Sequence, residues 1–304
     1  MIKTCWNHYH APGTVEEAVT LLERYNGQAQ VLGGGTDLLL EIQQGLKPPV
    51  EAMIDPSRIA GLAEISRSED HIVIGCAVTH TRIINDAGII RHGTCLAEGC
   101  GVIGGPQVRN VGTLAGNVAH ALPAGDGTIA LLALGGEVEV TDSTGSRWIP
   151  LQDTFLGPGK SAIDHHRALI TRLKFKPSGP REGSAFFRIM RPQGVALPMI
   201  SMAASLCLNE SNMIESARIA VAPSGPVPSL SEAAMEALVG KPATQEQLAN
   251  AAEAALNNMS LRSSKYRASR EYREEMVRTH LPRIMARAAE RAATGHAEPR
   301  GVGQ

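Results

Sequence analysis

Aromatic residues are scarce in this chain of 304 residues, which has only 2 tryptophans, 4 tyrosines and 4 phenylalanines. Neither sign of charge prevails, because 29 Lys and Arg residues face 30 Asp and Glu residues. A protein whose main partner is a nucleic acid or an anionic membrane usually carries a clear positive excess. The balance therefore argues against both partners and favours a small molecule or another protein.

The 5 cysteines are scattered and contain no CxxC pair. An odd, scattered set argues against a disulfide framework and against a zinc or iron–sulfur site within this chain. The N-terminus has no apolar signal core, and no uninterrupted apolar run is long enough to span a bilayer. Because reduced thiols persist in reducing compartments, we expect a cytoplasmic protein without a membrane span.

Glycine, in contrast, is abundant, with 31 residues. The first cluster, residues 33–35, lies between a predicted strand at 29–32 and a helix that starts at Leu38. Consecutive glycine amides can approach and hold an anion such as a pyrophosphate. A tight strand-to-helix turn capped by Thr36 or Asp37 needs the same glycines, so this loop alone leaves both interpretations open.

The second cluster places 10 glycines between residues 99 and 136. No charged residue lies between Arg109 and Asp126, although Thr113 and Asn117 keep the segment polar. Amides for phosphate, Thr113 and Asn117 for hydrogen bonds and Asp126 for sugar hydroxyls would suit a bound cofactor. The alternative is a buried loop packed on small residues, with Asp126 capping a helix over 127–133.

The spacing of the histidines does not indicate a metal site. His8 and His10 would share one face of a strand and residues 165–166 form a second pair, but neither pair has a third ligand nearby. Surface or hydrogen-bonded histidines are the better interpretation. Cys95 and Cys100, five residues apart on a predicted helix, are interpreted as buried thiols and not as redox partners.

The strongest linker signal is Pro177, Gly179 and Pro180. Before it, apolar periodicity predicts helices over 14–25, 38–43, 82–85, 88–100 and 127–133, and strands over 29–32, 52–55, 63–68, 71–76, 137–141, 147–150 and 168–175. After it, we expect strands over 185–190, 200–208 and 213–222, then helices from about Ser231, Thr244 and Ser264. The basic segment 262–300 is either a solvated helix face or a docking surface.

These elements predict an α+β fold. We expect a first domain over residues 1–177, with sub-domains of about 1–57 and 58–177. A small domain of antiparallel sheet plus helices follows over 178–293, and a disordered tail over 294–304.

At the two glycine clusters the sequence resembles the FAD-binding medium subunit of the molybdenum-containing hydroxylases, the family of xanthine dehydrogenase and carbon monoxide dehydrogenase. The resemblance rests on residues 33–38, 107–117 and 123–126, in the family's order and approximate spacing, and extends over most of residues 1–290. It implies a two-part FAD-binding domain of the vanillyl-alcohol-oxidase type followed by a small C-terminal domain.

The resemblance also implies which residues contact the FAD. Those expected around the pyrophosphate are Val31, Leu32, Gly33, Gly34, Gly35, Thr36, Asp37 and Leu38. Those expected in the second phosphate-binding turn are Thr113, Leu114, Ala115, Gly116 and Asn117. Asp126 would hold sugar or ribityl hydroxyls, Ile103 and Ile170 would lie against the rings, and Arg188 falls near a position where the family usually has Lys.

Finally, the resemblance implies an oxidoreductase subunit with no catalytic acid or base of its own. A large subunit with a molybdenum cofactor would oxidise the substrate, a small subunit with [2Fe-2S] clusters would relay electrons, and the FAD of this chain would pass them to an external acceptor. A dimer of heterotrimers is expected. The alternatives are a stand-alone FAD-dependent oxidoreductase with its own substrate pocket and a non-enzymatic dinucleotide-binding scaffold.

Overall fold

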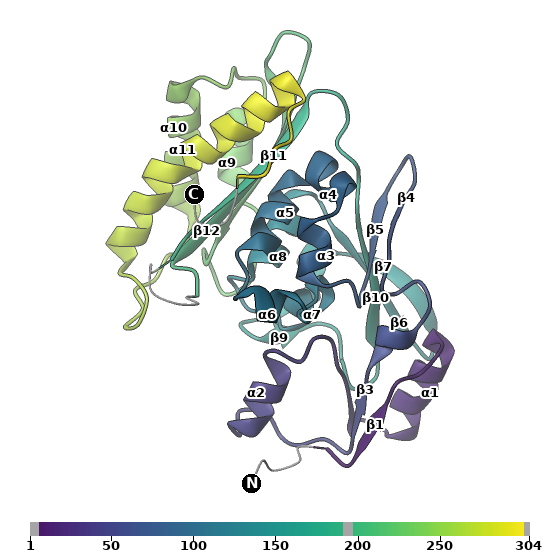
Figure 1. Ribbon diagram of the computed structural model, residues 1–304. Helices are drawn as coiled ribbons and strands as arrows, with labels where there is room; N and C mark the ends of the chain where they lie inside the picture. The colour runs from purple at the N-terminus through teal and green to yellow at the C-terminus, as the bar shows by residue number, and fades with distance from the viewer. Residues whose placement is uncertain (1–5, 191–196, 301–304) are drawn as a thin grey trace.

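The computed structural model describes residues 6–190 and 197–300 of the chain and begins with a small parallel sheet (Figure 1). Its strands are β1 (His8–His10), β2 (Ala29–Val31) and β3 (Ala52–Ile54), with β3 in the middle. Helix α1 (Val15–Arg24) begins where predicted, because the Thr14 hydroxyl accepts the Glu17 backbone N–H at 3.1 Å. Helix α2 (Leu38–Gln43) follows the first glycine cluster directly.

The second part is an antiparallel sheet of five strands in the order β4-β5-β10-β6-β7. Its strands are β4 (Ile65–Arg67), β5 (Ile72–Gly75), β10 (Leu169–Phe175), β6 (Glu137–Asp142) and β7 (Gly145–Pro150). Its helices are α3 (His80–Ile84), α4 (Ala87–His92), α5 (Thr94–Gly101), α6 (Pro106–Arg109), α7 (Leu114–Ala119) and α8 (Asp126–Ala133). A small hairpin of β8 (Phe155–Gly157) and β9 (Lys160–Ser161) completes it. In Figure 1, α2 faces α6 and α7 from the first part.

The C-terminal part is a three-stranded antiparallel sheet with helices on one face (Figure 1). Its strands are β11 (Glu182–Ile189), β12 (Ile200–Leu208) and β13 (Ile214–Ala222), and its helices are α9 (Glu232–Leu238), α10 (Gln245–Asn258) and α11 (Arg270–Thr294). Helix α11 packs along β11 and β12, while the opposite face of the sheet contacts α5 and α8.

The apolar core is continuous through the first two parts and extends to this second face of the C-terminal sheet, where Phe186, Ala203 and Ala220 join it. A second core lies between the C-terminal sheet and its helices. The sheet is therefore covered on both faces, which explains why most positions of β12 and of the second half of β13 are buried.

The structure corrects two of the predicted helices. The helix predicted over 88–100 is two helices, α4 and α5, that meet at Gly93. A Cβ at Gly93 would lie 2.8 Å from the Phe175 ring, so tertiary packing requires glycine there. The last helix begins at Arg270 and not near Ser264, because the Ser269 hydroxyl accepts the Tyr272 backbone N–H at 3.2 Å.

The predicted disordered tail is also wrong for residues 295–300. The backbone N–H of Arg300 donates to Glu98 at 3.0 Å, and Arg291 donates to the carbonyl of Glu298 at 2.6 Å. A buried carboxylate and a buried guanidinium thus supply partners for a segment that has no regular structure of its own. Residues 301–304 and Cys5 lie outside the described residues.

Two further predictions concern the thiols and the basic C-terminal segment. Cys95 and Cys100 are fully buried, as predicted, and burial raises the pKa of Cys95 to about 12. Helix α11 is not simply a solvated basic face, because Arg273 and Arg291 are buried. Among residues 6–190 and 197–300, no helix combines the length and apolar character needed to cross a bilayer.

Candidate functional site

The first glycine turn, residues 33–37, connects β2 to α2. Gly35 has a φ of +70°, a conformation that favours glycine. A Cβ at Gly34 would lie 2.1 Å from the backbone carbonyl oxygen of Val111, so only glycine permits the contact with the second cluster. The backbone of this turn therefore packs directly against the backbone of residues 111–112.

The second glycine turn leads into α7, where the Thr113 hydroxyl accepts the Gly116 backbone N–H at 3.0 Å. Gly33 and Gly116 face each other across the junction: a Cβ at Gly33 would lie 3.1 Å from Thr113 Oγ1 and 3.7 Å from Gly116 Cα. Two turns separated by about eighty residues thus form one surface of exposed backbone.

This surface lines a cavity of about 350 Å³, within the usual size range of small-molecule sites. Most of the residues singled out from the sequence line it: Val31, Gly33, Gly34, Gly35, Thr36, Asp37, Leu38, Ile103, Thr113, Ala115, Gly116, Asn117, Asp126, Ile170 and Arg188. The side chains of Leu32 and Leu114 pack elsewhere. Leu114 is fully buried in the main core, and Leu32 packs against the small cluster around Met53.

Asp126 joins the cavity to the C-terminal sheet. It is the first residue of α8, but its side chain does not cap that helix. Its carboxylate accepts from Arg188 Nη1 on β11 at 2.7 Å and from the Ser201 hydroxyl on β12 at 2.6 Å. Burial raises the pKa of Asp126, and the Arg188 guanidinium opposes that rise. Arg188 Nε is buried and has no partner among the described residues, so this corner retains an unused donor.

A polar network at the cavity rim was not foreseen from the sequence. His120, directly after α7, contacts Glu41 on α2 at 2.9 Å, and Lys47 lies 2.8 Å from the other carboxylate oxygen of Glu41. Burial would raise the pKa of Glu41, but hydrogen bonds from Lys47 and His120 lower it. The network ties the two parts that carry the glycine turns to each other.

Two lining histidines, His80 and His165, were also missed as site residues. Each has a buried ring nitrogen without a partner among the described residues, Nδ1 in His80 and Nε2 in His165. His80 is brought to the cavity because its backbone N–H donates to the carbonyl of Gly112 at 2.9 Å. Burial lowers the pKa of both rings to about 4. Both are therefore neutral near pH 7.

The burial of His80 should make stability depend on pH. Burial, aided by the charge of Arg109, lowers its pKa from 6.5 to about 4, whereas the unfolded chain takes up this proton near pH 6.5. Below that pH the unfolded state binds more protons, so the free energy of unfolding should fall between pH 6.5 and 4, by about 3 kcal/mol from this residue. Urea titrations of the ligand-free chain at several pH values measure this loss.

The matched variants for that series are His80→Gln and His8→Gln. His8 is 56% exposed, so its replacement should leave the slope of stability against pH as it is. His80→Gln should flatten the slope. If His80→Gln left the slope of stability against pH unchanged, the buried His80 ring would not be the cause of the pH dependence.

Comparison with known proteins gives two domain matches. Residues 3–175 match the family described as the FAD binding domain in molybdopterin dehydrogenase, and residues 185–288 match the CO dehydrogenase flavoprotein C-terminal domain. The xanthine dehydrogenase FAD-binding subunit of Escherichia coli O157:H7 is 31% identical over 290 residues, which are 94% of this chain and 97% of that protein. The nicotinate dehydrogenase FAD-subunit of Eubacterium barkeri is 30% identical over 79% of this chain and 82% of its own length.

Solved structures agree with these matches. The reconstituted CO dehydrogenase from Oligotropha carboxidovorans matches with a TM-score of 0.88 and 26% identity, over 96% of this chain and 100% of that chain. Quinoline 2-oxidoreductase from Pseudomonas putida 86 matches with a TM-score of 0.85 and 25% identity, over 94% of this chain and 98% of that chain.

Fold and domain matches together define the class, an oxidoreductase flavoprotein built from an FAD-binding domain and a CO dehydrogenase-type C-terminal domain. Within that class, the chain belongs to the FAD-binding medium subunits of the molybdopterin dehydrogenases. The predicted family, α+β fold and FAD cofactor are thereby confirmed.

Proposed function

We propose that the cavity lined by the two glycine turns holds the FAD, with its diphosphate against the adjoining backbone of Gly33 and Gly116. The observation that carries this proposal is the apposition of these two residues. Within 4 Å, a Cβ at Gly116 would meet only one atom of the described residues, Thr113 Oγ1 at 3.1 Å, so they leave the space in front of this backbone open. The Gly116 N–H already donates to Thr113 Oγ1, but the backbone N–H groups of residues 33–36 have no partner among the described residues, and such groups bind phosphate oxygens well. The residues present therefore fit the cofactor.

The other contacts follow from the lining of the cavity. Residues 31–38 and 113–117 would surround the diphosphate, while Ile103 and Ile170 offer apolar surface to the rings. Asp126 would accept from sugar or ribityl hydroxyls, because a carboxylate has about four lone-pair positions and the protein uses two. The free Nε of Arg188 is a further donor to the same ligand.

We further propose that this chain is the subunit of an electron-transfer complex that passes electrons to an external acceptor. Bound FAD supplies a carrier that accepts and releases two electrons, and the protein binds, orients and shields it. The electrons would arrive from [2Fe-2S] clusters of a small subunit, after oxidation of the substrate at a molybdenum cofactor in a large subunit. The names of relatives such as the nicotine 6-hydroxylase medium subunit of Paenarthrobacter nicotinovorans support this assembly.

The domain division is part of the same proposal. Residues 1–177 would bind the cofactor, and residues 178–293 would close the cavity through Arg188 and Ser201 and contribute to the docking of partners. The dimer of heterotrimers and the external acceptor stay predictions from the resemblance, and the cytoplasmic location stays a prediction from the scattered cysteines.

Purification of the complex through a tag on this chain tests the electron-transfer role. We expect FAD, iron and molybdenum to co-purify with the chain. In a separate anaerobic stopped-flow experiment, we expect the flavin absorbance to bleach when the reduced [2Fe-2S] subunit is mixed with the FAD-loaded chain. A chain that purifies alone and whose flavin the reduced iron–sulfur subunit does not bleach would support the stand-alone oxidoreductase. FAD that binds but never changes redox state would support the scaffold.

A further inference from the structure

The face of the C-terminal sheet that meets the first domain has three sections. Arg188 and Ser201 pair in register at the FAD cavity, and Phe186 and Ala203 pair next to them in the apolar core. Ser184 and its register partner on β12, Ser205, come next and lie farther along the strands from the FAD cavity. At this far, polar section, which is separated from the FAD cavity by the apolar one, a second cavity lies between the two domains.

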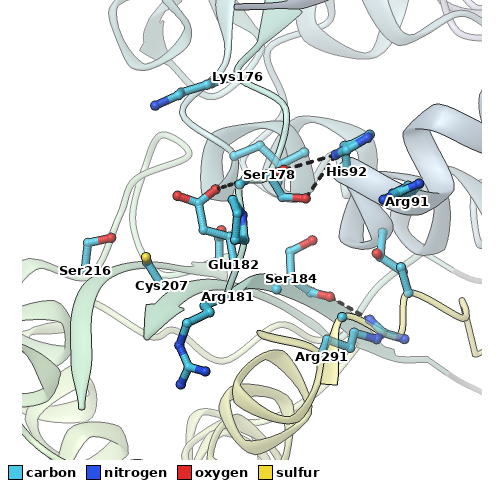
Figure 2. A pocket seen from close by; sticks show the side chains of 18 of the residues that line it. Arg91, His92, Lys176, Ser178, Arg181, Glu182, Ser184, Cys207, Ser216 and Arg291 are labelled. Atoms are coloured by element: carbon cyan, nitrogen blue, oxygen red, sulfur yellow. Dashed lines mark hydrogen bonds between the residues drawn. The ribbon is translucent and has the colours of Figure 1, made fainter. Parts of the chain in front are cut away.

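This second cavity has a volume of about 580 Å³ and lies between the two domains. Its walls come from α4 and α5, from the linker 176–181, from the strands β11–β13 and from the C-terminal segment. Figure 2 shows Arg91 and His92 on the helical side and Cys207 and Ser216 on the strand side. None of the residues assigned to the FAD lines it.

The lining of this cavity is strongly basic. It includes the side chains of Arg91, His92, Lys176, Arg181, Arg218 and Arg291. The one carboxylate in the lining, Glu182, already accepts the backbone N–H of Gly179 at 2.8 Å. The cavity therefore has a positive potential that its own acid does not balance.

Two of these arginines already have partners. Arg291 pairs with the buried Glu98, and Arg181 donates to backbone carbonyls at the end of β12. Arg91, Lys176 and Arg218, in contrast, form no ion pair within residues 6–190 and 197–300. These three positive charges are available to a ligand.

Arg218 is the most informative of the three. It is half-buried, and its one hydrogen bond to the part of the chain that the structure describes is a long contact of 3.5 Å from Nε to the carbonyl of Leu132. Burial lowers its pKa, which means that the charged form is desolvated without compensation. Gly135 leaves room for the guanidinium, because a Cβ there would lie 3.3 Å from it. A desolvated, unpaired guanidinium beside a cavity is a typical anion contact.

We propose that this interdomain cavity is a second ligand site, which binds a phosphorylated small molecule through Arg218, Arg91 and Lys176. Guanidinium groups bind phosphate oxygens bidentately, and serine hydroxyls such as those of Ser205 and Ser216 add donors. The volume accommodates a ligand of nucleotide size as well as a free phosphate. A ligand there touches both domains and stabilises their association.

Calorimetric titration of the FAD-loaded chain tests this proposal, because bound FAD prevents nucleotides from entering the first cavity. The probes are inorganic phosphate, pyrophosphate and ADP, at constant ionic strength set with sodium chloride. We expect saturable binding and an increase in thermal stability. Tighter binding of ADP than of inorganic phosphate assigns the site to an organic phosphate, and equal binding assigns it to the free ion.

The matched variants are Arg218→Gln and Arg147→Gln. Arg147 is 54% exposed on β7, outside the cavity, so its replacement removes the same charge without touching the site. Arg218→Gln should weaken binding by about tenfold or more, while the FAD content stays unchanged. If Arg218→Gln does not fold, the exposed Lys176→Gln serves instead. No saturable binding of any probe, or equal weakening by Arg147→Gln, would overturn the proposal.

Discussion

Replacement of Gly116 by valine should abolish FAD binding and leave the chain folded. Among the described residues, the new Cβ would meet only the Thr113 hydroxyl, at 3.1 Å, a tight contact that a small shift of this side chain relieves, so the fold should persist. The valine side chain would, however, occupy the space assigned to the diphosphate. Displacement of the diphosphate would break at least two of its charge-assisted hydrogen bonds to backbone N–H groups, each worth about 1.5–3 kcal/mol. The Kd for FAD should therefore rise by at least about a hundredfold. Titration of the FAD-free chain with FAD measures the change.

The control for this variant is Gly13→Val. Gly13 is exposed before α1, and a Cβ there would meet only Glu17 Oε2, at 3.8 Å. It introduces the same side chain at a distance from the cavity and should leave FAD affinity unchanged. Wild-type flavin content in Gly116→Val would contradict the placement of the diphosphate at the second turn.

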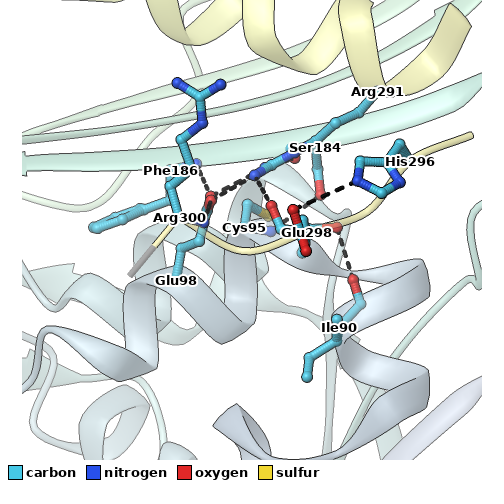
Figure 3. Close-up of polar contacts among 10 residues, drawn as sticks. Ile90, Cys95, Glu98, Ser184, Phe186, Arg291, His296, Glu298 and Arg300 are labelled. Atoms are coloured by element: carbon cyan, nitrogen blue, oxygen red, sulfur yellow. Dashed lines mark hydrogen bonds and ion pairs between the residues drawn. The ribbon is translucent and has the colours of Figure 1, made fainter. Parts of the chain in front are cut away.

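Replacement of Arg291 by methionine should destabilise the chain by about 3–5 kcal/mol, because it leaves the charge of Glu98 buried and unpaired. The two side chains are only 6% and 3% exposed and are joined at 2.7 Å. Figure 3 shows Glu98 at the centre of this group, where it also accepts the backbone N–H groups of Phe186 and Arg300. Both domains and the C-terminal segment therefore depend on one carboxylate. Urea unfolding measures the loss.

An exposed ion pair provides the comparison. Arg278 contacts Glu253 at 2.6 Å, but both side chains are nearly half exposed, so Arg278→Met should cost about 1 kcal/mol or less. The double variant Arg291→Met with Glu98→Leu should recover part of the stability, because it removes the unpaired buried charge. If Arg291→Met and Arg278→Met had equal effects, the buried pair would not hold the domains together.

The glycine turns were predictable because their signal is local. Residues 33–35 follow a strand, the second cluster contains a charge-free segment between Arg109 and Asp126, and the two motifs together resemble one family. The resemblance also reached Ile103, Ile170 and Arg188, which line the same cavity although they are distant in the sequence.

The remainder of the site depends on contacts that no local pattern encodes. His80 reaches the cavity through a backbone bond to Gly112, and Gly93 divides a helix because of the Phe175 ring. The tail from residue 295 was expected to be disordered, because its composition gives no indication of the Glu98 carboxylate that binds it. Apolar periodicity identifies most elements, but it carries no information about which of them meet.

A crystal structure of the FAD-loaded chain tests the central claim most directly. The diphosphate should lie about 3 Å from backbone N–H groups of both turns, residues 33–36 and 113–117, with the rings beside Ile103 and Ile170. FAD bound elsewhere, for example in the basic cavity around Arg218, or a purified chain that takes up no FAD, would contradict it.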